Sequence, residues 1–117
     1  MTFVRVQGFA LKEGYYEWNG SPDLSVKVSG HAGFAKKGED IVCAAASVLV
    51  QALSVSLAAK KIAQSISRDD GVLFVSVEWG KMKDNEKRSV ASAFDLMIHG
   101  FRAMAESYPE NITISIE

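Results

Sequence analysis

A cysteine and a histidine twelve positions apart are the residues best suited to chemistry. Cys43 is the only cysteine of the chain, and His31 precedes it across a glycine-containing segment. A thiolate is the nucleophilic form of cysteine, and a nearby imidazole can take the thiol proton. The pair therefore indicates nucleophilic catalysis, with Cys43 as the candidate nucleophile and His31 as the candidate general base.

A helix predicted over residues 40–59 places Cys43. Asp40 is a suitable N-cap, because its carboxylate can accept hydrogen bonds from the N–H groups of Val42 or Cys43. Cys43 is then in the first helical turn, where free N–H groups and the helix dipole favour an anion. The same N–H groups are candidates for holding an oxyanion. Ser47, one turn beyond Cys43, is a candidate to line the pocket.

The helical position of Cys43 argues against a purely structural role, although free cysteines are usually buried as small hydrophobes. Helical spacing places Cys43 on one face with Ser47, Gln51 and Ser54. This face is the polar stripe of an otherwise apolar helix. We expect the core-facing side to consist of other residues: Ile41, Ala45, Val48, Ala52 and Val55.

Three glycines, Gly30, Gly33 and Gly38, surround the segment between the histidine and the cysteine. Glycine makes a loop compliant, so the pattern predicts a flexible loop that closes over the catalytic pair. The alternative is a surface connection in which the glycines only satisfy turns.

The second histidine, His99, falls on the polar face of a later helix, where we expect it to be solvated and paired with Asp95. Two histidines and one cysteine without tight spacing make a poor zinc site. We expect neither a metal nor an organic cofactor.

Length and composition predict one soluble domain over residues 1–117. Hydrophobic residues make up 48% and charged residues 23%, and the formal net charge is -1. Bulk attraction to nucleic acid or to an anionic membrane is therefore not expected. The N-terminal segment lacks the basic-then-apolar order of a signal peptide. The longest apolar stretch, 41–57, is interrupted by polar residues, so we expect a cytoplasmic protein without a membrane span.

The remaining pattern predicts an α+β domain. Strands at 2–11 and 24–28 form a hairpin-like pair across a turn at 18–22. After the first helix we expect strands at 61–67 and 72–77. A second helix follows the charged run 84–88, and its core stripe is Val90, Phe94, Met97, Ile98, Phe101, Ala105 and Tyr108. A closing strand around 112–116 completes the order β-β-α-β-β-α-β, with two helices packed on a mainly antiparallel sheet.

The segment Gly30-His31-Ala32, followed by Asp40-Ile41-Val42-Cys43-Ala44-Ala45 and Ser47, resembles the signature of the ribosomal-processing cysteine proteases, the Prp family. The similarity extends over the whole chain, with Ala46 as a departure where valine is frequent. It implies a homodimeric endopeptidase with a Cys–His dyad and a flexible loop over the site. Its implied substrate is the N-terminal extension of the bacterial large-subunit ribosomal protein number twenty-seven. By motif position, His31 is the base and Cys43 the nucleophile.

Two other functions fit the position of Cys43. One is a non-enzymatic ribosome-assembly factor that binds the same ribosomal-protein tail in the same cleft. The other is a thiol-dependent regulator in which Cys43 senses oxidants. The nearby His31 and the resemblance favour proteolysis over both.

Overall fold

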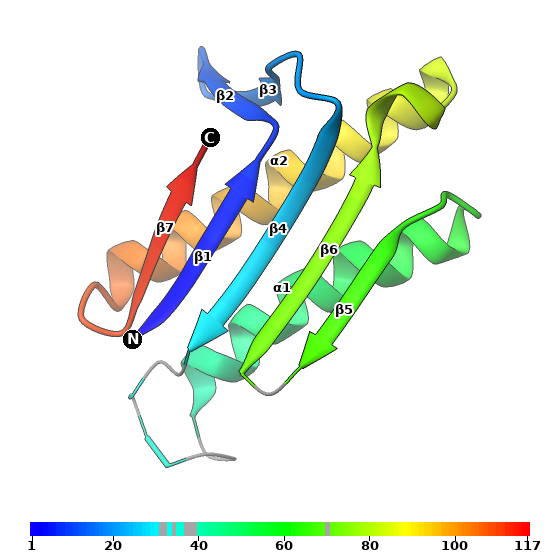
Figure 1. Ribbon diagram of the computed structural model, residues 1–117. Coiled ribbons are helices and arrows are strands. Elements are labelled where there is room, and N and C mark those ends of the chain that lie inside the picture. Colours follow the sequence, from blue (N-terminus) through cyan, green and yellow to red (C-terminus); the bar gives the residue numbers. More distant parts are fainter. Residues whose placement is uncertain (31–32, 34, 37–39, 70) are drawn as a thin grey trace.

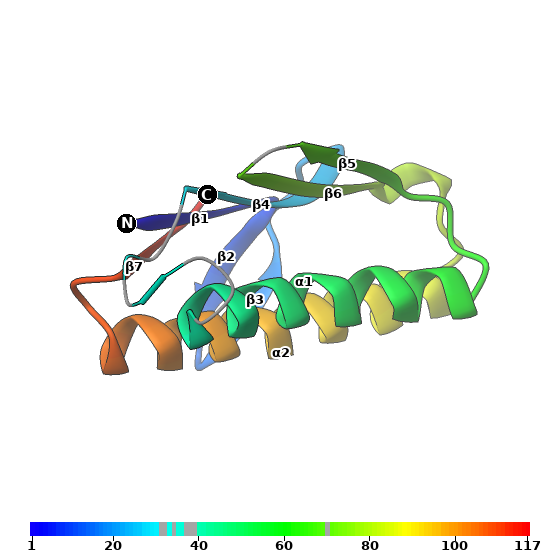
Figure 2. The same ribbon diagram turned by 90° about the horizontal axis from the view of Figure 1, so that it is seen from below.

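In the computed structural model, five strands form one mixed sheet, and two long helices lie side by side on one face of it (Figures 1 and 2). The structure describes residues 1–30, 33, 35–36, 40–69 and 71–117. The elements are β1 Thr2–Gln7, β2 Phe9–Lys12, β3 Tyr15–Trp18, β4 Asp23–Gly30, α1 Ile41–Ala59, β5 Ser65–Asp69, β6 Val72–Glu78, the short 3-10 helix η1 Trp79–Lys81, α2 Asp84–Ser107 and β7 Ile112–Ile116.

The sheet has the order β5-β6-β4-β1-β7. Three neighbouring pairs are antiparallel, and β7 pairs with β1 in parallel. The prediction of an α+β domain with a mainly antiparallel sheet is confirmed. The hairpin-like pairing of the two N-terminal segments is also confirmed, because β1 pairs with β4 from Thr2↔Gly30 to Gln7↔Ser25.

The prediction of one strand over 2–11 is wrong, because this segment is divided at Gly8. Gly8 has φ +101°, and a Cβ there would lie 2.6 Å from Leu24 Cδ2 and 2.8 Å from the Asp23 carbonyl oxygen. The chain turns at this point, and β2 pairs with β3 in a separate hairpin. That hairpin packs on α2, where Phe9 stacks on Phe94 at 4.9 Å between ring centroids.

The core lies between the sheet and the helices. Alternate strand residues face inward, which fits a sheet covered on one side. The α2 stripe is confirmed: five of its members are buried, and Ala105 and Tyr108 are partly buried against the core. The buried residues of α1 are Val42, Ala46, Val50, Leu53 and Leu57.

The predicted core face of α1 is wrong. Ile41 is 56% exposed, Val48 62% and Val55 68%, so none of these three residues is buried against the sheet. Helix α1 carries two apolar stripes on opposite sides, so periodicity alone could not tell which one meets the sheet. The outcome is an apolar face of α1 that nothing in the described chain covers.

Helix α1 also has the length and average composition of a membrane-spanning helix, although we expected its polar residues to prevent this. It is the one such helix among the residues described. Composition alone does not separate a core helix from a membrane span. Here the stripe from Val42 to Leu57 is buried against the sheet, as in a core helix.

Gly30, at the end of β4, gives a stability prediction. It has φ +83°, and a Cβ there would lie 2.5 Å from the carbonyl oxygen of Met1. We expect Gly30→Ala to lower the free energy of unfolding by about 1–3 kcal/mol, through backbone strain and this clash. Gly33→Ala is the control, because Gly33 also has positive φ but a Cβ there would meet none of the described residues within 4 Å. Urea unfolding of both variants measures the difference, and equal losses would contradict a role for the Met1 contact.

Candidate active site

The start of α1, the end of β4 and the start of β6 lie at the same end of the molecule (Figure 1). Cys43 is half-buried in the first turn of α1, as predicted from the Asp40 cap. It lines a hollow of about 300 Å³ together with residues from four strands and from α1 itself. The full lining is Thr2, Val28, Gly30, Cys43, Ala46, Ser47, Gln51, Arg68, Asp69, Gly71, Val72 and Leu73.

Asp40 is the N-cap of α1. It is 7% exposed, and its Oδ1 accepts hydrogen bonds from Val42 N at 2.9 Å and Cys43 N at 3.0 Å. Its Oδ2 accepts a longer bond from Ala35 N at 3.4 Å. The carboxylate therefore fixes the first turn of the helix and also contacts the backbone of Ala35.

This cap changes the expected source of oxyanion stabilisation. The N–H groups of Val42 and Cys43 donate to the Asp40 carboxylate, and Ala44 N donates to the Asp40 carbonyl at 3.1 Å. The prediction that N–H groups at the start of this helix hold an oxyanion is therefore not supported for residues 42–44, because each already has an acceptor.

Ser47 follows Cys43 by one helical turn and lines the same hollow, the position predicted for it from the sequence. Its Oγ accepts a hydrogen bond from Gln51 Nε2 at 2.7 Å. The predicted polar face thus consists of neighbours in space, with Cys43, Ser47 and Gln51 lining one wall of the hollow.

The remaining predicted site residues are His31 and the three glycines Gly30, Gly33 and Gly38. His31 and Gly38 lie outside the described residues, so the Cys–His pair remains a prediction. Gly30 is the last residue of β4 and lines the hollow with Cys43; its N–H donates to Gly71 O at 3.0 Å. Gly33 is in the connection between β4 and α1.

Sequence reasoning missed Thr2 and Arg68. Thr2 is buried, and its Oγ1 has no hydrogen-bond partner among the residues described, although the residue lines the hollow. Arg68 reaches the hollow from β5, a strand expected at 61–67 but found at Ser65–Asp69. Thr2 carried no sequence signal, since only the pairing of β1 with β4 brings it near Cys43.

His99 belongs elsewhere in the molecule. Its Nε2 lies 3.3 Å from Asp95 Oδ1 and 3.1 Å from the Gly14 carbonyl oxygen, which confirms the expected pairing with Asp95. Asp95 Oδ1 also accepts from Tyr16 N at 2.7 Å, so the group holds the β2–β3 hairpin onto α2. In the part of the chain that the structure describes, no cluster of three or more His, Cys, Asp or Glu residues could hold a metal ion.

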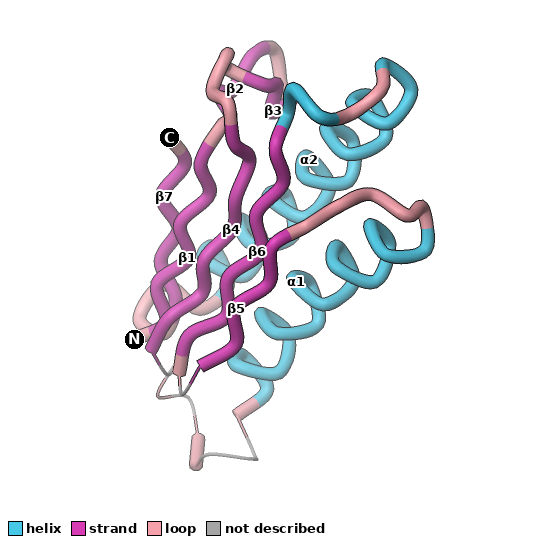
Figure 3. Tube along the Cα trace, turned by 45° about the vertical axis from the view of Figure 1, so that its right-hand side comes forward, coloured by secondary structure: helices cyan, strands magenta, loops and turns pink. Residues whose placement is uncertain are grey.

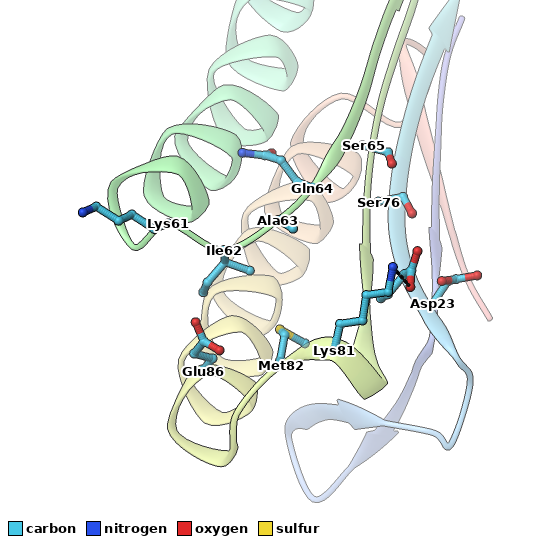
Figure 4. Close-up of a pocket in the computed structure, with 11 residues that line it drawn as sticks. Asp23, Lys61, Ile62, Ala63, Gln64, Ser65, Ser76, Lys81, Met82 and Glu86 are labelled. Atoms are coloured by element: carbon cyan, nitrogen blue, oxygen red, sulfur yellow. Dashed lines mark ion pairs between the residues drawn. The ribbon is translucent and has the colours of Figure 1, made fainter.

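Two larger hollows lie away from Cys43. One, of about 570 Å³, is at the opposite end of α1 (Figure 4), and the Lys81–Glu78 ion pair of 3.0 Å lies at its wall. The other, of about 590 Å³, lies beside the stacked rings of Trp18 and Trp79. The described lining of both lacks cysteine and histidine. The Cys43 hollow is therefore the better candidate for nucleophilic chemistry.

A half-buried cysteine in a capped first helical turn, beside a hollow, is typical of thiol-dependent enzymes. The family model described as cysteine protease Prp matches residues 19–113, which include this site. The chain therefore belongs to the cysteine protease Prp family.

Solved structures share the fold. SMU.848 from Streptococcus mutans is 26% identical with a TM-score of 0.66, and the match covers 99% of this chain and 93% of that one. Two structures are of the essential ribosomal processing protease Prp from S. aureus. The one with a covalently linked product peptide is 24% identical to this chain, with a TM-score of 0.73. The one in complex with a substrate peptide is 22% identical, with a TM-score of 0.69. Both S. aureus matches cover 100% of each chain. The comparison with curated proteins gave no match.

Proposed function

We propose that this cysteine protease removes the N-terminal extension of the large-subunit ribosomal protein number twenty-seven, with Cys43 as nucleophile and His31 as general base. The observation that carries the proposal is the opening of Cys43 onto a hollow inside the region matched by the family model. Gly30, the residue before His31, lines the same hollow. The S. aureus protein of the same fold is a ribosomal processing protease with a bound substrate peptide.

The proposed reaction proceeds through an acyl-enzyme. His31 takes the Cys43 proton, and the sulfur attacks the scissile carbonyl carbon while the carbonyl electron pair moves to oxygen. As this intermediate collapses, the C–N bond breaks and the leaving amine takes the proton from His31. Water then gives a proton to His31 and attacks the thioester, which releases the carboxylic acid, and the proton returns to sulfur.

Other residues support this chemistry without taking part in bond changes. Asp40 holds the turn that carries Cys43, through its bonds to Val42 N and Cys43 N. Ser47 borders the hollow, with its hydroxyl fixed by Gln51. The proposed bond changes use only side chains and water, without a metal or an organic cofactor.

The test is a mass-spectrometric cleavage assay on a synthetic peptide that spans the extended N-terminus of ribosomal protein twenty-seven from the same organism. We expect one cut that removes the extension. A peptide with its scissile-bond residues in scrambled order is the matched control. Binding without any new peptide terminus would contradict the proposal and favour the assembly-factor function.

We further propose that the protein is a homodimer that buries the outer face of α1. Ile41 and Val48 lie on this exposed apolar face, and the described chain leaves them uncovered. Exposed apolar patches of this kind usually mark interaction surfaces. A two-fold contact of α1 against α1 would cover both copies at once.

The dimer proposal predicts that Val48→Asp gives monomers in size-exclusion chromatography with light scattering, because the charge would be desolvated in the contact. Phe3→Asp is the control, since Phe3 is 54% exposed and alternates with the buried residues of β1, on the helix-free face of the sheet. A wild-type monomer, or a Val48→Asp dimer, would contradict this interface.

A further inference from the structure

The hollow beside Cys43 continues as a groove between α1 and β5. A second hollow of about 170 Å³ follows it, and Gln51, Arg68 and Leu73 line both. Figure 3 shows α1 running alongside the strand at this edge of the sheet. The groove therefore begins at the candidate nucleophile and follows the polar stripe of the helix. The use of this groove by substrate rests on the proposed function.

The walls of the groove differ in character. The helix supplies Ser47, Gln51 and Ser54, while the strand supplies Ile66 and Arg68. Ile66 pairs with Val75, and Arg68 pairs with Leu73, so both strand residues share the helix-facing side with their partners. The second hollow is mainly apolar, with Val50, Val55, Ile66, Leu73 and Val75 in its lining. It fits an aliphatic side chain.

Two hydrogen bonds close the far end of the groove. Ser54 Oγ donates to Gln64 Oε1 at 2.8 Å, and Gln64 Nε2 donates to the Ser54 carbonyl oxygen at 2.9 Å. Gln64 also borders the cavity of Figure 4, which lies on the other side of this crossing. From Cys43 to Ser54 the helix rises by about 16 Å. An extended peptide covers that length with about five residues.

The edge of β5 is open along this groove. In the described sheet β5 is a terminal strand and pairs only with β6. All five residues of β5 are exposed. In an antiparallel pair, alternate residues direct their N–H and C=O groups away from the partner strand, so β5 offers a row of backbone donors and acceptors above the groove.

We infer that substrate binds as an added strand on β5. The segment on one side of the scissile bond pairs its backbone with the outer edge of β5 between Ser65 and Arg68, and alternate side chains enter the groove above Ser47 and Gln51. An extended peptide is the ligand that fits the edge of β5, since its main-chain hydrogen bonds to the strand give affinity. Pockets for alternate side chains give specificity. One aliphatic side chain fills the hollow beside Ile66.

N-methylation of substrate amides tests the backbone pairing. We expect losses of kcat/KM of about tenfold or more at every second residue over about five residues on one side of the cut, because a methyl group removes a donor and blocks the strand approach. The intervening amides should tolerate methylation. Shortening the peptide beyond those residues should leave kcat/KM unchanged, since the Ser54–Gln64 crossing ends the groove.

Two adjacent β5 variants test the groove. Ile66→Glu places a charge in the apolar hollow, and we expect a rise in KM of about tenfold for a peptide with an aliphatic residue at that subsite. Ser67→Glu is the matched control, because Ser67 pairs with Phe74 on the opposite face of the same exposed strand. Equal effects of the two variants, with both proteins folded by circular dichroism, would overturn the groove assignment.

The choice of peptide should allow strand addition and the proposed ribosomal substrate to be tested independently of each other. Digestion of a proteome-derived peptide library by the wild-type protein identifies cleaved peptides without assuming the ribosomal target. If the ribosomal peptide is not cut but library peptides are, the proposed substrate is wrong and the N-methyl series continues on a library peptide. If cleavage shows no two-residue alternation, strand addition is wrong while the protease function stands. If no peptide in the library is cut, both proposals are wrong.

Discussion

Cys43→Ala should abolish peptide cleavage, with a fall in kcat of at least about 10⁴-fold, because Cys43 is the only cysteine of the chain and its sulfur forms the acyl-enzyme in the proposed reaction. The side chain is half-buried at the edge of the hollow, so its loss should leave folding and peptide binding nearly unchanged. Mass spectrometry of the products measures the cleavage, and fluorescence anisotropy of a labelled peptide measures the binding.

Ser47→Ala is the matched control for this prediction. It also removes a small polar group from the same hollow, one helical turn away. Ser47 takes no part in the proposed bond changes, so the variant should keep activity within about tenfold of wild type. Cleavage by Cys43→Ala at the wild-type site would show that another residue is the nucleophile.

Asp40→Ala should lower the free energy of unfolding by about 2 kcal/mol. The buried carboxylate accepts bonds from Val42 N and Cys43 N, and the variant leaves both donors without this acceptor. Because Cys43 belongs to the turn that Asp40 fixes, kcat should fall as well. Urea unfolding and peptide cleavage measure the two effects.

Asp40→Asn separates the capping bond from the charge. Asparagine caps helices about as well as aspartate, so most of the stability should return. If stability returns and kcat does not, the negative charge contributes to catalysis. If Asp40→Ala is as stable as the wild type, the cap does not have the role assigned to it.

The sequence predicted α1 and its start well because local signals determine them. Asp40 is a capping residue, and the run that follows has no helix breaker, so the cap on Val42 N and Cys43 N could be predicted. The place of Cys43 in the first turn followed from that cap. The hollow beside it could not be predicted, since Arg68 and Leu73 reach it only through the pairing of β5 with β6.

The errors share one physical cause, which is that tertiary contacts decide between local alternatives. Val48 and Val50 are equally suited to a core, and only the position of the sheet buries Val50 and exposes Val48. The strand at 2–11 was predicted as continuous because its residues are β-formers throughout. The positive φ of Gly8 and its close contact with Leu24 divide it into β1 and β2.

The most direct test of the central claim is to trap the acyl-enzyme. Wild-type protein is mixed with its cleaved peptide, quenched in acid within the first turnover, and analysed by intact-mass and peptide-mapping spectrometry. We predict an adduct with the mass of the N-terminal product fragment minus water, attached to Cys43. A known cysteine protease treated in the same way shows that the quench preserves thioesters. If the peptide is turned over and the adduct lies on another residue, or if no adduct forms on Cys43 under these conditions, the assignment of Cys43 as the nucleophile is contradicted.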